Sequence, residues 1–193
     1  MEIINERLLY PSYEIIGGEK IMAPAANTRH NAIGGRLYMF IGTYLDAKNL
    51  GYCFTDSTDI HFLDGSLFSP DFSVVLKENK QIINWGGDIY GAPDMVVEVL
   101  SYSTRKKDVT IKKDTYEAQG VREYWIVDPR AKSVMVYILQ DGKYFLDDVY
   151  LLLNEEDLNL LDEEEKADVK YKVPVSILDG LEIPIEFIFS WGY

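Results

Sequence analysis

Residues 94–100 read DMVVEVL, and this stretch decides the fold that the sequence predicts. Its apolar residues are mostly β-branched and almost uninterrupted, which is typical of a central strand buried on both faces. Residues 104–119 follow with a helical pattern, which Gly120 ends, and residues 123–128 (EYWIVD) form the next strand. Strand, helix and strand in this order predict an α/β (α+β) protein with a mixed sheet.

The segments on either side predict one more long helix and several strands. Residues 28–47 carry an apolar stripe at i, i+4, i+7 and i+8, which indicates a helix with one buried face. Residues 70–76 (PDFSVVL) indicate a short buried strand, with proline at the first position, where a missing N–H is tolerated. Pairs of strands are expected at residues 10–24 around Gly17-Gly18, at 133–151 around Asp141-Gly142 and at 169–189 around Asp179-Gly180.

The remaining segments give weaker signals. Residues 52–62 carry mixed strand signals, and residues 77–92 are a long polar and glycine-rich connection. The acidic residues 154–168 predict a loop or a solvated helix, and Thr104 or Asp108 can cap the helix over 104–119.

The charge of the chain is strongly negative but uneven. The net charge is -13, so the protein surface as a whole is not expected to bind nucleic acid through positive charge. Residues 154–170 hold eight acidic residues against two lysines. Five basic residues lie together elsewhere, namely Arg105, Lys106, Lys107, Lys112 and Lys113. The overall sign therefore does not decide what the surface near these residues binds.

Length and composition predict one cytoplasmic domain. At 193 residues the chain is expected to be a single domain over 1–193, with a core at about 28–128 and a C-terminal strand extension at about 133–189. A single cysteine, Cys53, excludes an intrachain disulfide and is compatible with a reducing compartment. No apolar run approaches the ~20 residues that cross a bilayer, and the first ten residues are unlike a secretory signal.

Two acidic residues in buried strands are the first candidates for chemistry. Glu98 lies in the middle of DMVVEVL, where a carboxylate is costly unless it is paired, hydrogen-bonded or bound to a metal. A salt bridge to a helix lysine is the structural interpretation. Asp71 opens the strand over 70–76, and if the two strands are neighbours, their spacing of ~4.8 Å brings Asp71 beside Glu98. The two carboxylates could then share a proton, bind a divalent cation or accept from an arginine.

Asp94 lies on the same pleat face as Glu98, but four residues away. This spacing is ~13 Å at ~3.3 Å per residue, which is too far for both carboxylates to hold one ion. Asp94 is therefore expected to make backbone hydrogen bonds at the entry of the strand, after Pro93.

The helix after DMVVEVL supplies candidate cations. Val109, Lys112, Lys113 and Tyr116 share one face at i, i+3, i+4 and i+7. A lysine on this face could orient a metal-bound water or offset charge on a phosphate. A solvated helix with an Asp108–Lys112 pair is the structural alternative.

His30 is the remaining candidate, on the apolar stripe of the first helix. A lone histidine on such a face is more often a core residue, but this helix is expected to cover the sheet, so His30 could reach the site. With two histidines and one cysteine, a zinc site of nitrogen and sulfur ligands has weak support. The sequence also lacks the GxSxG, P-loop, GxGxxG and HExxH motifs.

Several of these motifs together resemble one family. The pairs Pro70-Asp71 and Pro93-Asp94, the strand with Glu98, the helix with Lys112 and Tyr116, and EYWIVD followed by Pro129 are similar to the putative restriction endonuclease family of the PD-(D/E)XK nuclease superfamily. The opening YEIIGGE, the helix with His30 and the closing strand pair through Gly180-Leu181 also resemble it, so the likeness covers roughly residues 10–189.

The resemblance implies a restriction-endonuclease-like mixed central sheet flanked by helices, with extra strands at both ends. It further implies that Asp71, Glu98 and the backbone carbonyl of Val99 bind Mg²⁺, with Mn²⁺ as a substitute. The superfamily lysine that follows the glutamate by two positions is replaced here by Leu100. In this family that lysine lies on the following helix, which points to Lys112, with Lys113 as the alternative.

The expected function is therefore a Mg²⁺-dependent endonuclease acting on DNA. Asp71 and Glu98 would hold the ion, and Lys112 would assist the attacking water. A nuclease-like module that no longer cuts, and a hydrolase of a small phosphate compound, are the alternatives. Apolar edge strands and 14 tyrosines are compatible with a homodimer.

Overall fold

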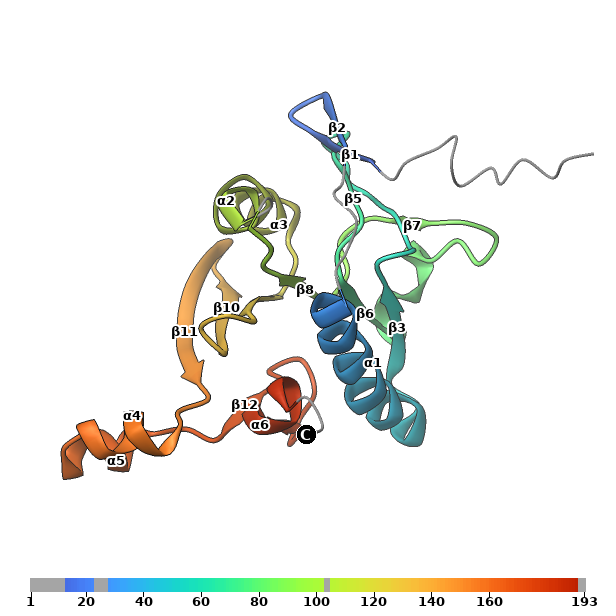
Figure 1. Ribbon diagram of the computed structural model, residues 1–193. Coiled ribbons are helices and arrows are strands. Elements are labelled where there is room, and N and C mark those ends of the chain that lie inside the picture. Colours follow the sequence, from blue (N-terminus) through green and yellow to red (C-terminus); the bar gives the residue numbers. More distant parts are fainter. Residues whose placement is uncertain (1–12, 23–27, 103–104, 191–193) are drawn as a thin grey trace, which may run out of the picture.

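The computed structural model describes residues 13–22, 28–102 and 105–190. The predicted mixed α+β architecture is confirmed (Figure 1). The central sheet has six strands in the order β11-β10-β9-β8-β6-β3, and only β8 and β9 run parallel. Its strands are β3 (Gly51–Thr55), β6 (Phe72–Leu76), β8 (Met95–Val99), β9 (Glu123–Asp128), β10 (Ser133–Gln140) and β11 (Lys143–Leu151).

A second sheet lies beside the first and consists of short strands in the order β2-β1-β5-β4-β7. These are β1 (Tyr13–Ile16), β2 (Glu19–Met22), β4 (Ile60–His61), β5 (Leu67–Phe68) and β7 (Ile89–Tyr90). Near the C-terminal end of the described chain, β12 (Lys172–Pro174) pairs with β13 (Glu182–Pro184).

Helices lie against the sheets and extend from them. The long helix is α1 (Thr28–Lys48), and the helix that follows β8 runs through α2 (Arg105–Lys107), the π-helical turn η3 (Asp108–Lys112) and α3 (Lys113–Gln119). The shorter helices are the 3₁₀ helix η2 (Lys77–Ile82), α4 (Glu155–Leu160), α5 (Glu163–Asp168) and α6 (Ile185–Phe189). Within the described residues, none of the helices combines the length and apolar character needed to cross a membrane.

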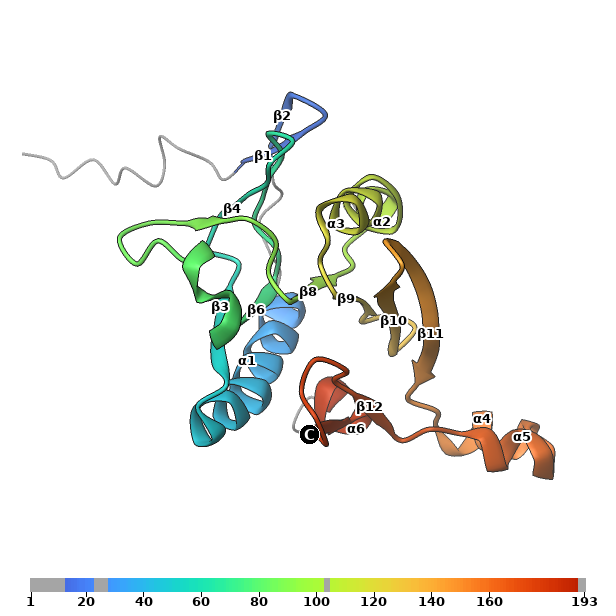
Figure 2. The ribbon, with the colours of Figure 1, turned by 180° about the vertical axis from the view of Figure 1, so that it is seen from behind.

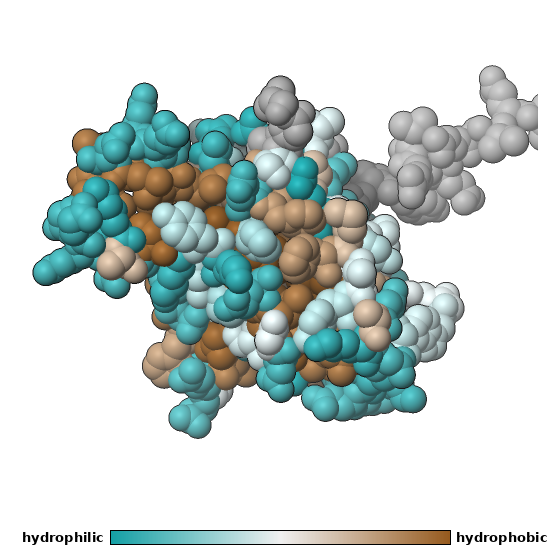
Figure 3. All heavy atoms as spheres, turned by 90° about the horizontal axis from the view of Figure 1, so that it is seen from below, coloured by the Kyte–Doolittle hydropathy of each residue, from teal (hydrophilic) through white to brown (hydrophobic). Residues whose placement is uncertain are grey.

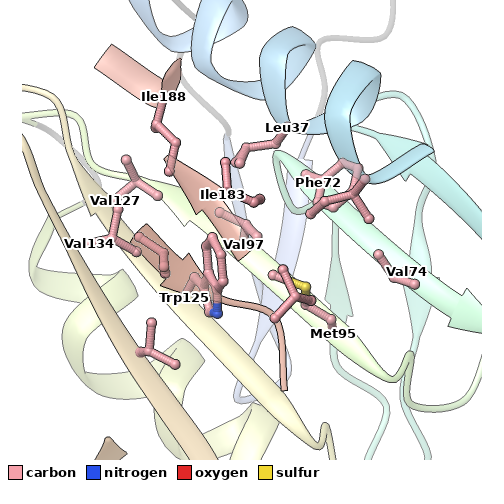
Figure 4. Close-up of a cluster of buried hydrophobic side chains, with 14 of the residues drawn as sticks. Leu37, Phe72, Val74, Met95, Val97, Trp125, Val127, Val134, Ile183 and Ile188 are labelled. Carbon is pink, nitrogen blue, oxygen red and sulfur yellow. The ribbon is translucent and has the colours of Figure 1, made fainter. Parts of the chain in front are cut away.

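Each face of the central sheet buries its own apolar cluster. One cluster joins α1 and the C-terminal elements to the sheet through side chains such as Leu37, Val97, Trp125 and Ile188 (Figure 4). The opposite cluster joins the sheet to α3 and the second sheet, and includes Val96, Leu100 and Tyr116. Because side chains alternate along a strand, Glu98 shares the face of Val96 and Leu100. Glu98 therefore points toward α3 and away from α1.

The tight turns form where the glycines predicted them. Gly17 and Gly18 both have positive φ between β1 and β2, and so do Asp141 and Gly142 between β10 and β11. This backbone is the one that two-residue hairpin loops require. Gly120 ends α3 in the left-handed conformation, at φ 87°.

The structure corrects three expectations for the helices. The helix begins at Arg105 among the described residues, so Asp108 lies inside it and does not cap it, while Thr104 lies outside the described residues. The connection over 77–92 contains η2 and β7. Residues 185–189 form a helix in place of the expected strand end, because Ile185, Ile188 and Phe189 bury one side at helical spacing.

Candidate functional site

The two predicted carboxylates meet where β6 begins and β8 ends. The strands are antiparallel neighbours, with Phe72 opposite Val97. Continuing this register by one residue places Asp71 opposite Glu98, on the face that α3 covers. The strands over 70–76 and 94–100 are therefore neighbours, as the pairing of Asp71 with Glu98 required.

Asp71 is held in place by two contacts. The backbone N–H of Val99 donates to Asp71 Oδ2 at 2.6 Å, and His30 Nδ1 lies 3.1 Å from Asp71 Oδ1. Burial raises the pKa of Asp71 to about 6, although His30 and the Val99 N–H oppose this shift. His30 thus reaches the site from the first turns of α1.

Glu98 lies deeper and receives two donors on one oxygen. Lys112 Nζ is 2.9 Å and the Tyr116 hydroxyl is 2.6 Å from Glu98 Oε1. Burial raises the pKa of Glu98 well above its usual range, although Lys112 opposes the shift. The salt bridge to a helix lysine is therefore present, and it lies inside the proposed site.

Lys112 stands between several carboxylates. Its Nζ lies 2.6 Å from Glu14 Oε1 and 3.7 Å from Asp108 Oδ1, in addition to the contact with Glu98. The side chain is 4% exposed, which rules out the solvated alternative for this residue. Burial alone would lower the pKa of Lys112, but Glu98, Glu14 and Asp108 together raise it, so the ammonium stays charged.

The π-helical turn explains why Lys112 is buried and Val109 is not. Asp108, Lys112 and Tyr116 are buried at four-residue spacing, while Val109 is 37% exposed. Hydrogen bonds of the i→i+5 type put more residues into a turn than an α-helix has, so the side chains around this turn are rotated relative to a regular helix. Val109 was expected on the same helix face as Lys112 and Tyr116, but the irregular turn leaves it outside the buried face.

Glu14 is the site residue that sequence reasoning missed. It lies on β1, on the same side of the strand as the buried Ile16. An acidic residue at an inward position of an alternating strand was the available signal. The structure shows what that position contacts, namely a lysine on a different element.

Asp94 and Lys113 lie away from this cluster. Asp94 Oδ2 accepts from the backbone N–H of Leu76 at 2.8 Å, and Arg122 Nη1 lies 3.1 Å from its Oδ1, at the opposite end of β8. This is the backbone-bonding role expected for a strand entry. Lys113 Nζ lies 5.3 Å from the centre of the Tyr137 ring and 3.8 Å from Asp114. Of the two lysines, Lys112 is the one beside Glu98.

The donor set of the site fits a hard divalent cation. Four acidic side chains, those of Glu14, Asp71, Glu98 and Asp108, lie around the single ammonium of Lys112. Mg²⁺ is commonly bound by one or two carboxylates together with waters. No group of three histidine, cysteine, aspartate or glutamate side chains in the part of the chain that the structure describes is arranged to hold an ion. Asp71 and Glu98 are the two carboxylates here that lie on adjacent strands and could hold an ion, with the Val99 backbone beside them.

Access to the site is from the side of Asp71. A cavity of about 190 Å³ lies between α1 and the end of β3 and is lined by Asp71, His30 and five further residues: Asn31, Gly34, Gly35, Thr55 and Asp56. The side chains of Asp71 and His30 are 12% and 13% exposed, against 5% for Glu98. The cavity is smaller than the ~300 Å³ at which drug-sized pockets begin.

Comparisons with known proteins identify a family and a solved structure of the same fold. The family model described as Uma2, putative restriction endonuclease, matches residues 6–168. A solved structure described as a putative nuclease belonging to DUF820, from Anabaena variabilis ATCC 29413, superposes with a TM-score of 0.71. The two chains are 24% identical, and the match covers 94% of this chain and 91% of that one, which shows a shared fold. The curated proteins contain no match.

Proposed function

Because this chain belongs to the Uma2 family of putative restriction endonucleases, we propose that it is a metal-dependent endonuclease that hydrolyses phosphodiester bonds in DNA. The observation that carries the proposal is the pair Asp71 and Glu98, side by side on neighbouring strands with Lys112 against Glu98. Two carboxylates that could hold a metal, with a cation beside them, suit metal-assisted phosphate hydrolysis.

Asp71 and Glu98 would hold Mg²⁺, or Mn²⁺ in its place, together with the Val99 backbone carbonyl. When bound, the metal would lower the pKa of a water and offset charge on the phosphate. His30 keeps Asp71 oriented through its contact at Oδ1, and Tyr116 orients Glu98 through Oε1. Lys112 places a positive charge beside Glu98, where it orients the attacking water and offsets charge on the phosphate.

DNA as the substrate is supported by the basic start of the helix that follows β8. Lys106 is exposed there, next to Arg105 and Lys107, on a chain of net charge -13. Such residues neutralise backbone phosphates, whereas the acidic residues 154–170 lie in a separate part of the chain. The single cysteine supports a reducing compartment, and we propose the cytoplasm.

A catalytically inactive binding module is the second candidate. It is favoured by the enclosure of Lys112, which is 4% exposed and contacts Glu14, Glu98 and Asp108. In such a module the enclosed lysine would have a structural role alone, holding the three carboxylates together.

The test is a calorimetric titration of Mn²⁺ and Mg²⁺ combined with cleavage of plasmid DNA. We expect the wild-type protein to bind the ion and to nick DNA, and we expect Asp71→Asn and Glu98→Gln each to lose both. Each substitution removes one charged oxygen ligand without changing the size of the side chain.

Asp94→Asn is the matched control, because it makes the same change at the other end of β8 and should keep both properties. Full metal-dependent cleavage by Glu98→Gln would contradict the assignment. A wild-type protein that neither binds the ion nor cuts any DNA tested would favour the inactive module.

We also propose a homodimer formed through β11. This strand is at one end of the central sheet. It exposes Phe145, Leu146, Val149 and Leu151, which are each 40–53% exposed. An apolar edge strand of this kind is a ready site for association.

A further inference from the structure

The Lys112 ammonium contacts one carboxylate from each of the two sheets. Its shortest contact, 2.6 Å, is to Glu14 Oε1, and the contact to Glu98 Oε1 is 2.9 Å. Glu14 belongs to β1 of the second sheet, whereas Lys112 follows the central strand β8. Two carboxylates from different sheets thus share one ammonium group.

The second sheet holds Glu14 at this position by ordinary strand alternation. Ile15 of β1 pairs with Leu67 of β5, so Glu14 and Ile16 point to the opposite side, toward the apolar cluster under α3. The chain leaves β5 and reaches Asp71 three residues after Phe68. The β1–β2 hairpin is therefore tied to the strand that leads into the site.

Phe68 and Tyr116 complete the surroundings of the ammonium. The Lys112 Nζ lies 5.6 Å from the centre of the Phe68 ring, which packs edge-on against Tyr116 at 5.3 Å. Glu14 itself is 9% exposed. The lysine is enclosed by apolar rings, and its hydrogen-bond acceptors come from Glu14 on one side and Glu98 on the other.

Two hydrogen-bond acceptors fix the position of the Lys112 ammonium more closely than one acceptor can. An ammonium has three donors and a flexible four-carbon stem, so a single partner leaves its position variable. Without Glu14, Glu98 Oε1 would be the close acceptor left to the ammonium among the described residues, since Asp108 Oδ1 is 3.7 Å away. The Tyr116 hydroxyl also donates to this Glu98 oxygen. The lysine would then turn about Glu98.

We propose that Glu14 is a positioning residue, which holds the Lys112 ammonium beside Glu98 and acts on the reaction through that lysine. The hairpin over residues 13–22 thereby completes the site, although it belongs to another sheet. The kinetic part of this inference rests on the proposed nuclease function, whereas the structural part does not.

The structural part is tested by the rate at which an acetylating reagent modifies Lys112, followed by mass spectrometry. We expect Glu14→Ala to raise this rate about tenfold or more, with Glu14→Gln between it and the wild type, because glutamine keeps an oxygen acceptor but loses the charge. Lys113 of the same helix is the internal reference. Glu19→Ala is the matched control, since Glu19 is an exposed glutamate of the same hairpin. An unchanged rate in Glu14→Ala would overturn the proposal.

The kinetic part is tested by DNA cleavage. We expect Glu14→Ala to lower kcat by about 10–100-fold with little change in KM, the usual effect of removing a group that orients a catalytic residue. In a Lys112→Met background, Glu14→Ala should cause no further loss. A normal kcat, or a loss that adds in full to that of Lys112→Met, would refute the role. If the wild-type protein cuts nothing, the proposed function fails, and the labelling rates still decide whether Glu14 positions Lys112.

Discussion

Glu98 shows how a carboxylate can be accommodated in a buried strand. An unpaired carboxylate at this depth costs several kcal/mol, but Lys112 and Tyr116 both donate to Glu98 Oε1. This compensation joins the strand to the helix that follows it. Removing Lys112 leaves the buried Glu98 without its ionic partner, and removing Tyr116 takes away one of its two hydrogen bonds, so both substitutions are expected to affect stability as well as chemistry.

Glu123 is a second buried carboxylate, and its role is in the fold. Trp125 Nε1 donates to Glu123 Oε1 at 2.7 Å, and the backbone N–H of Ile177 donates to Oε2 at 2.9 Å. Burial raises the pKa of Glu123 to about 7, although these hydrogen bonds oppose the shift. Glu123 thus connects β9 with the segment between β12 and β13.

This shift predicts a pH dependence of stability with a definite sign. Between pH 4.5 and 7 the folded protein holds the Glu123 proton more tightly than the unfolded chain, so stability from this group is present at low pH and is lost as pH rises to about 7. We expect the wild-type protein to lose on the order of 2–3 kcal/mol relative to Glu123→Gln between pH 5 and pH 8. Urea unfolding of both proteins at several pH values measures this difference, and other titrating groups cancel in the comparison. If the difference in unfolding free energy between the two proteins did not change with pH, the pKa of Glu123 would not be raised in the folded state.

At the scale of elements, the helix after β8 combines a regular end with an irregular middle. Gly120 ends it in the left-handed conformation, as its sequence position predicts. The π-helical turn over Asp108–Lys112 has no comparable local signal in the sequence. Turns of this type are frequent at functional sites, and this one brings Lys112 to Glu98.

Two glycines predict opposite effects of adding a methyl group. A Cβ at Gly120 would meet no atom within 4 Å, but φ is +87°, so Gly120→Ala should cost about 1 kcal/mol through backbone strain alone. Gly35 lies inside α1, where a Cβ also meets no atom, so Gly35→Ala should stabilise the protein by roughly 0.5–1 kcal/mol. Urea unfolding midpoints measure both. Equal signs for the two substitutions would contradict the conformational argument.

For the whole molecule, charge and apolar surface are unevenly distributed. The acidic helices α4 and α5 extend from the end of β11, away from the central sheet (Figure 2). Seen from below, hydrophobic residues lie among hydrophilic ones on the left, the side where Figure 1 places these helices (Figure 3). We propose that the chain is nevertheless one domain, because Val173 and Ile183 of the C-terminal strands pack in the same cluster as Leu37 and Val97.

The proposed dimer through β11 predicts an unusual salt dependence. Two copies of net charge -13 repel each other, and salt screens this repulsion while leaving the apolar contact intact. Sedimentation velocity should therefore show more dimer at 0.5 M than at 0.05 M salt. Leu146→Lys should reduce the dimer at both salt concentrations. Leu63→Lys, which changes a leucine that is 95% exposed on another part of the surface, should not. A monomer at all concentrations and salts would exclude this assembly.

Local patterns in the sequence determined the elements and two of the site's carboxylates. The strand over 94–100, the helix over 28–47 and the glycine turns follow from side-chain period and backbone conformation, which neighbouring residues settle. The family resemblance was confirmed by the match over residues 6–168. The position of Asp71 beside Glu98 required one further assumption, that the two strands are neighbours, and the sheet bears this out.

Only the tertiary structure decided how the site is assembled. The contact between Glu14 and Lys112 joins residues nearly a hundred positions apart, and the contact between His30 and Asp71 depends on how α1 crosses the end of the sheet. The choice of Lys112 over Lys113 follows from the π-helical turn, which packing against the second sheet accommodates. Such contacts depend on how sheets and helices pack against each other, because each residue type by itself is compatible with many partners.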